Sequence, residues 1–156
     1  MKYTKKKYPS RRFITYSLLS FLSPQFLSAN KICYQTPYQP SGPFFSTNTK
    51  FNGNDMTNEG KAIGKKIQIS GQVMNKNCKP YLNATIHIWQ ANAFGRYFHK
   101  YDKSKNELDN NFNGYTKIKT NKDGFYKFLT VYPGSYMISE KISRPSHIHL
   151  QITTAK

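Results

Sequence analysis

Residues that commonly bind metals are scarce in this 156-residue chain. It contains only two cysteines, which are too few for a cysteine-rich zinc site, and only seven acidic residues. Histidine is also rare, with four copies at positions 87, 99, 147 and 149. Any metal bound here must therefore take some of its ligands from another residue type. Tyrosine, with twelve copies, is the abundant candidate, and its hard oxygen suits ferric iron.

Negatively charged residues are also scarce. The chain has 24 Lys and Arg residues and only seven Asp and Glu residues, which gives a net charge of +17. Such a balance suggests nucleic acid or an anionic membrane as a partner. The distribution argues against this, since six basic residues lie in the first twelve positions and the remaining lysines are scattered singly. We therefore predict no nucleic-acid partner.

Long apolar runs are missing as well. The longest, residues 13–23, is too short and too interrupted to remain in a bilayer as a permanent span. It follows a basic segment that ends in Ser10-Arg11-Arg12, an order that resembles a twin-arginine signal. We predict that residues 1–29 export the chain to the periplasm or the cell exterior. A disordered basic tail is the alternative.

Helical periodicity is absent over any eleven residues, and the rest of the chain divides into two parts. Residues 30–65 form an arm rich in Pro, Gly and Asn, in which we expect Tyr38, Phe44 and Phe45 to pack against the domain. Residues 66–156 show short alternating segments separated by turn residues, which indicates an all-β fold, an antiparallel β-sandwich. The expected strands cover 67–73, with a bulge or close approach at Gly71, 84–90, 125–131, 135–138 and 147–152, and a long loop covers 95–116.

The two cysteines, Cys33 and Cys78, lie in the arm and near the first strands. In an exported chain they can pair, which would tie the arm to the domain and stabilise it by ~3–4 kcal/mol. Two free thiols are equally compatible with the sequence.

The last predicted strand carries His147 and His149, which would point to one face with Cα atoms roughly 6.5–7 Å apart. A single metal ion can reach both imidazoles at that spacing. Ile148, Leu150 and Ile152 would then form a buried row on the other face. Most His-x-His pairs are not metal sites, so this pair alone decides nothing.

A series of motifs in a fixed order carries more weight. The series is Gln39-x-x-Gly42-Pro43-Phe44-Phe45, Ile88-Trp89-Gln90-Ala91-Asn92-Ala93, Gly95-Arg96-Tyr97-x-His99-x-x-Asp102, Asp109-x-Asn111-Phe112-x-Gly114-Tyr115, Gly124-x-Tyr126-x-Phe128-x-Thr130, Pro133-Gly134-x-Tyr136 and Arg144-Pro145-x-His147-x-His149. From about Cys33 onward the chain resembles the intradiol ring-cleavage dioxygenases, in particular the protocatechuate 3,4-dioxygenase β-subunit type.

This resemblance implies a mononuclear Fe(III) bound by Tyr97, Tyr136, His147 and His149. Tyr136 and His147 would be axial, and Tyr97 and His149 equatorial beside a hydroxide. Phenolate oxygens are hard anionic ligands that favour Fe(III) over zinc or copper. A trivalent cation also removes the proton of a phenol, whose ordinary pKa is about 10. His87, His99, Tyr115 and Tyr126 are interpreted as structural.

The reaction implied by the resemblance is O2 insertion into a catechol, which yields a cis,cis-muconate-type dicarboxylate. Tyr136 would accept a substrate proton, and Arg144, if turned inward, would stabilise the anionic substrate. Arg144 as a surface residue at a strand end is the alternative. A protocatechuate-like substrate suits a basic pocket, while catechol and hydroxyquinol stay open.

The chain departs from the resemblance at its end, because Lys156 follows His149 by seven residues whereas family members continue for several strands. We therefore expect a sandwich that is incomplete at the C-terminus, with a homo- or hetero-oligomeric partner completing its edge. Two other hypotheses remain at this point. One is an inactive truncation remnant, and the other is a metal-free envelope β-sandwich that binds a sugar or peptide.

Overall fold

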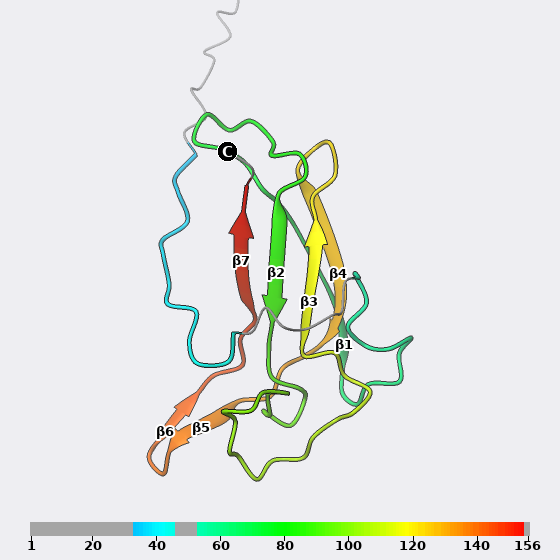
Figure 1. The fold of residues 1–156 in the computed structure, drawn as a ribbon, viewed down its shortest axis with the longest axis vertical. Coiled ribbons are helices and arrows are strands. Elements are labelled where there is room, and N and C mark those ends of the chain that lie inside the picture. Colours follow the sequence, from blue (N-terminus) through cyan, green and yellow to red (C-terminus); the bar gives the residue numbers. More distant parts are fainter. Residues whose placement is uncertain (1–32, 46–52, 155–156) are drawn as a thin grey trace, which may run out of the picture. The chain divides into compact units, whose positions relative to one another are not determined.

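The computed structural model describes residues 33–45 and 53–154, and within them every regular element is a β-strand (Figure 1). No helix in these ranges is long and apolar enough to cross a membrane. The strands are β1 (Lys66–Gln72), β2 (Thr85–Trp89), β3 (Tyr115–Lys119), β4 (Phe125–Val131), β5 (Tyr136–Ser139), β6 (Ile142–Arg144) and β7 (His149–Thr153).

All strand pairs are antiparallel, which agrees with the predicted all-β class. β1 pairs with β4, β5 pairs with β6, and the third sheet has the order β3-β2-β7 (Figure 1). The main core contains Ile86 and Ile88 of β2 together with Phe128 and Val131 of β4. The β1-β4 and β3-β2-β7 sheets therefore pack against each other through their apolar faces.

The opposite face of β2 belongs to a second cluster. Trp89 pairs with Tyr115 on β3 and with His149 on β7, so the three side chains share the face that points away from the main core. Trp89, Ala91, Tyr97 and Tyr115 form this second buried cluster. The alternation of β2 thus separates the core from the region that holds the candidate site.

Several predicted elements are confirmed. β2 and β4 lie in the predicted segments, β5 begins in one and extends one residue beyond it, and the long loop ends at residue 114, two residues earlier than predicted. At Gly71 the pairing of β1 is continuous, so the expected bulge is absent, but an added Cβ would lie 2.6 Å from Tyr126 Oη. The close approach is therefore real. β3 and β6 were not predicted; β3 begins within the segment assigned to the long loop, and β6 has only three residues.

The last strand differs from the prediction in two ways. β7 begins at His149, so His147 precedes it, and Leu150 and Ile152 are 41% and 45% exposed instead of buried. Both residues pair with the buried row of β2, at Ile88 and Ile86, and so point to the core face. β7 is at the edge of its sheet in the described part of the chain, where the second layer covers this row incompletely.

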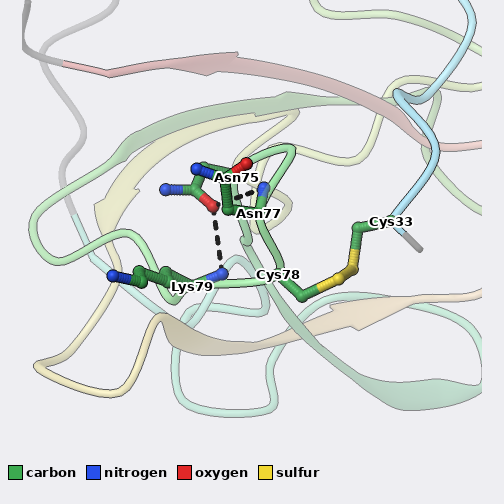
Figure 2. Close-up of a disulfide and its surroundings, with 5 residues drawn as sticks. All are labelled: Cys33, Asn75, Asn77, Cys78 and Lys79. Atoms are coloured by element: carbon green, nitrogen blue, oxygen red, sulfur yellow. Dashed lines mark hydrogen bonds between the residues drawn. A yellow bond between two sulfur atoms is a disulfide. The ribbon is translucent and has the colours of Figure 1, made fainter. Parts of the chain in front are cut away.

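The arm is covalently attached. Cys33 and Cys78 form a disulfide with their Cα atoms 5.4 Å apart, which decides between the two states that the sequence allowed (Figure 2). The turn that carries Cys78 is held by Asn75, whose Oδ1 accepts backbone hydrogen bonds from Asn77 and Lys79 (Figure 2). The disulfide anchors one end of the 33–45 segment to the domain.

The other end of the arm is held by aromatic packing. Phe44 and Phe45 pack on the second cluster, as expected, whereas Tyr38 is 88% exposed and does not. Residues 53–64, which composition groups with the arm, contribute Met56 and Ala62 to the main core. The predicted signal, residues 1–29, lies outside the described residues.

Candidate metal centre

Four side chains from three segments converge beside the second cluster. Tyr97 comes from the long loop after β2, Tyr136 is the first residue of β5, and His147 and His149 lie where the chain enters β7. The Nε2 atoms of the two histidines are 3.1 Å apart, and Tyr97 Oη lies 3.4 Å from His147 Nε2. The Tyr136 ring lies 5.4 Å from that of Tyr97 and 5.8 Å from that of His147, between centroids. The structure thus brings together all four residues selected from the motifs.

These distances suit a shared cation. Two donors that bind one ion at about 2.1 Å and at a right angle lie about 3 Å apart. His147 Nδ1 lies 2.7 Å from the Pro145 carbonyl oxygen, which only accepts, so Nδ1 donates this hydrogen bond and leaves Nε2 directed at the centre. Burial, His147 and Arg144 lower the pKa of His149 to about 4, so its imidazole is neutral at pH 7. His149 is therefore in the neutral form that binds metals, and the His147 ring is oriented with its Nε2 toward it.

Tyr97 needs a cation before it can ionise. Burial raises the pKa of its phenol well above the ordinary value, and the neighbouring Tyr136 and Asp102 raise it further, while Arg144 opposes them. In the protein alone Tyr97 is thus a neutral phenol. A bound trivalent ion reverses this balance because it stabilises the phenolate directly.

The donor set also indicates the kind of metal. No group of three or more His, Cys, Asp or Glu side chains gathers as a metal site within 33–45 and 53–154. The candidate ligands are instead two imidazoles and two phenols. When the phenols ionise, they provide two hard anionic oxygens. Such a set fits Fe(III) better than zinc or copper.

Two glycines allow the tyrosine-bearing segments to meet. Gly95, two residues before Tyr97, has φ +80°, and a Cβ there would fall on the carbonyl oxygen of Ser135, next to Tyr136. A Cβ on Gly134 would in turn fall on the backbone nitrogen of Gly95. The two segments therefore touch backbone to backbone, which only glycine permits.

This contact predicts a large effect for Gly95→Ala. We expect it to lower the free energy of unfolding by about 3 kcal/mol or more, because it adds a steric clash to an unfavourable backbone conformation. Gly60→Ala is the matched control, since Gly60 has φ +82° but nothing within 4 Å of an added Cβ, and should cost only about 1 kcal/mol. Urea unfolding followed by the fluorescence of the single tryptophan measures both. Equal losses in the two variants would contradict the predicted contact.

Two further aromatic rings pack against three of the four candidate ligands. The Trp89 ring stacks on His149 with centroids 4.6 Å apart and planes 1° from parallel. Phe44 stacks on Tyr97 at 4.3 Å and meets the edge of Tyr136 at 6.0 Å. The sequence predicted that Phe44 packs on the domain, but it carried no signal for the target of that packing.

Arg144 lies beside the centre although its side chain is exposed. It pairs with Tyr136 between β6 and β5, and its charge lowers the pKa values of both Tyr97 and His149. It is therefore a surface residue at a strand end and, at the same time, close enough to act on the site. This location is compatible with the proposed electrostatic role.

The other two histidines make different contacts. His87 Nδ1 is hydrogen bonded to Tyr115 Oη, and His99 Nδ1 accepts a hydrogen bond from the backbone of Tyr101. A cavity of about 250 Å³ next to His99 shares only Tyr97 with the four candidate ligands. It is lined by Arg96, Tyr97, Phe98, His99, Lys100 and Leu108.

The chain is similar to known dioxygenases. A dioxygenase family profile matches residues 41–156. The protocatechuate 3,4-dioxygenase β chain of Burkholderia cepacia is 40% identical over 95 residues, which are 60% of this chain and 40% of that one. An intradiol ring-cleavage dioxygenase of Aspergillus niger is 28% identical over 146 residues, which cover 80% of this chain and 45% of that one.

Comparison with a solved structure also points to an intradiol ring-cleavage dioxygenase. The intradiol ring-cleavage dioxygenase from Tetranychus urticae superposes with a TM-score of 0.61 at 26% identity, over 77% of this chain and 59% of that one. The chain spans less than half the length of the curated relatives it matches. Because the family profile covers more than half of its residues, the chain belongs to the intradiol ring-cleavage dioxygenase family.

Proposed function

We propose that this chain binds one Fe(III) through Tyr97, Tyr136, His147 and His149 and cleaves a catechol between its two hydroxyl-bearing carbons. The observation that carries the proposal is the convergence of these four side chains, with Nε2–Nε2 and Oη–Nε2 separations of 3.1 and 3.4 Å. Family membership supports the reaction type. Both oxygen atoms of O2 enter the product, a cis,cis-muconate-type dicarboxylate, so no external reductant is needed.

Tyr97, Tyr136, His147 and His149 would hold the Fe(III), which would supply a Lewis acid that makes the catechol reactive toward O2. The protein's contribution is to hold charge and protons in place. Two phenolates, from Tyr97 and Tyr136, offset two of the three positive charges. The Pro145 carbonyl fixes the His147 ring with Nε2 directed at His149 Nε2. Tyr136 accepts one catechol proton at its phenolic oxygen as the substrate binds.

The surrounding side chains prepare the site for an anionic substrate. Arg144 provides a fixed positive charge beside Tyr97 and His149. Phe44 stacks on Tyr97 and Trp89 stacks on His149, so aromatic surface shields one face of each of these two rings from water. A carboxylate on the catechol, as in a protocatechuate-like substrate, suits this positive environment.

Iron loading of the purified full chain tests the proposal. We expect one iron per chain, a red-brown colour from tyrosinate-to-iron charge transfer, and O2 uptake with ring-opened product from protocatechuate or catechol. A folded protein that takes up no iron and stays colourless would refute the proposal and favour a metal-free binding module. An insoluble or protease-sensitive product would favour a truncation remnant.

Arg144→Gln tests the electrostatic role. We expect kcat to fall by about 10²–10³, because loss of one preorganised positive charge next to the reacting anion commonly has this effect. Lys141→Gln, which removes the same charge from the exposed turn between β5 and β6, is the matched control and should leave kcat unchanged. Steady-state O2 uptake at equal iron content measures both. Equal rates for the two variants would assign Arg144 to the surface alone.

We also propose that residues 1–29 direct the chain out of the cytoplasm. The support is their twin-arginine-like order together with the disulfide between Cys33 and Cys78, since such bonds persist mainly in oxidising compartments.

A further inference from the structure

One buried amide joins the segments that carry the two tyrosines. Asn92 is 2% exposed, and its side chain uses both of its polar atoms. Oδ1 accepts backbone hydrogen bonds from Phe94 and Arg96, each at 3.0 Å, and Nδ2 donates to the carbonyl oxygen of Glu107 at 2.9 Å. The side chain therefore fastens both arms of the loop that contains Tyr97.

The backbone of the same residue reaches the second tyrosine. The Asn92 carbonyl oxygen accepts hydrogen bonds from Gly95 at 3.1 Å and from Gly134 at 2.9 Å, and its N–H donates to Arg96 at 2.8 Å. Arg96 is adjacent to Tyr97, and Gly134 is two residues before Tyr136. Asn92 is therefore hydrogen bonded to a residue that lies within two positions of Tyr97 and to another that lies within two positions of Tyr136.

We propose that Asn92 is a positioning residue that sets the separation and orientation of Tyr97 and Tyr136 at the iron centre, an inference that rests on the proposed function. A side-chain amide supplies two acceptor lone pairs on one atom and a donor on another, and this is the combination that the three partners use here. Aspartate keeps the acceptors but places a second oxygen against the Glu107 carbonyl, so the two oxygens repel. Alanine removes all three side-chain interactions.

This role differs from that of an ordinary buried polar residue. Thr120 is comparably buried, and its Oγ1 donates to the Tyr81 carbonyl oxygen at 2.6 Å and accepts from the Ala84 backbone at 2.9 Å. Its partners precede β2, whereas the candidate site lies at the other end of that strand, near Trp89. A change at Thr120 should therefore alter stability without altering the iron centre.

The experiment compares the iron-loaded full chain with its Asn92→Asp, Asn92→Ala and Thr120→Val variants. The readouts are the charge-transfer band, the electron paramagnetic resonance spectrum of Fe(III), the unfolding midpoint, and the rate at which a chelator removes iron. We expect both Asn92 variants to shift the band and the resonance spectrum and to lose iron at least about tenfold faster. Thr120→Val should lower the midpoint with wild-type spectra.

Asn92→Asp decides the outcome if Asn92→Ala does not fold, because it keeps the volume and the two acceptor bonds. Wild-type spectra and iron loss in Asn92→Asp would overturn this inference while the proposed function stands. A Thr120→Val variant with the same spectral shift as Asn92→Asp would also overturn it, because the effect would then be one of general stability. If the wild-type chain takes up no iron, the proposed function and this inference fail together.

Discussion

Removing either imidazole, in His147→Ala or His149→Ala, is expected to weaken Fe(III) binding more than about a hundredfold. Changes to groups that merely orient a ligand already cost about 10- to 100-fold in metal affinity, and these variants delete a ligand itself. The 3.1 Å separation of the two Nε2 atoms makes both rings necessary, since one ion can contact both. Competition with a coloured chelator measures the affinity.

His99→Ala is the control for these variants. His99 also lies near Phe44, with ring centroids 5.9 Å apart, but its Nδ1 is engaged by the Tyr101 backbone. This variant should keep its iron. Comparable iron loss in His99→Ala, or full retention in His147→Ala, would contradict the assignment of the histidines.

Tyr136→Phe tests the role of the Tyr136 phenolate oxygen independently of the packing of its ring. The variant keeps the packing of the Tyr136 ring against Tyr97 and His147 but removes one anionic oxygen. We therefore expect a changed charge-transfer colour and weaker iron binding with little loss of stability in the iron-free protein. A wild-type visible spectrum at full iron content would remove Tyr136 from the ligand set.

The second large effect is expected from the disulfide. Cys33 and Cys78 are 45 residues apart, and the chain-entropy model gives a stabilisation of about 4 kcal/mol for a closed loop of that length. This is a large part of the 5–15 kcal/mol that typically separates a folded domain from its unfolded state. A Cys33→Ser, Cys78→Ser double variant should therefore unfold at a much lower urea concentration.

The same variant should also disturb the site, because the bond anchors the segment that leads to Phe44 and Phe45. These rings cover Tyr97 and Trp89, with centroids 4.3 and 4.6 Å apart. Serine variants are preferable to a thiol reductant, which would reduce Fe(III) as well. Phe44→Ala with the disulfide intact is the control that changes the cover alone. An unchanged unfolding midpoint in the double variant would show that the tether contributes nothing to stability.

The four candidate ligands were selected through the resemblance to a known family, whose motifs contain them, and the structure brings their side chains together. The Gly95 and Gly134 motifs are local signals, since each marks a backbone that must turn sharply or meet another closely. The stacking of Phe44 on Tyr97 and of Trp89 on His149 could not be predicted, because neither has a local signature. Asn92 was part of a motif, but its hydrogen bonds to Glu107 and Gly134 appear only in the folded chain.

The amino-acid order by itself determined the strands with clear alternation, the long loop, and the chemistry of the two phenols and two imidazoles. These are local properties, because side chains on a strand alternate with a period of two wherever the strand lies. Only the tertiary structure decided that Cys33 pairs with Cys78, that β7 begins at His149, and that Leu150 and Ile152 stay largely uncovered at a sheet edge. Burial and pairing depend on neighbours distant in the chain, and alternation on one strand contains no information about how far the opposite layer extends.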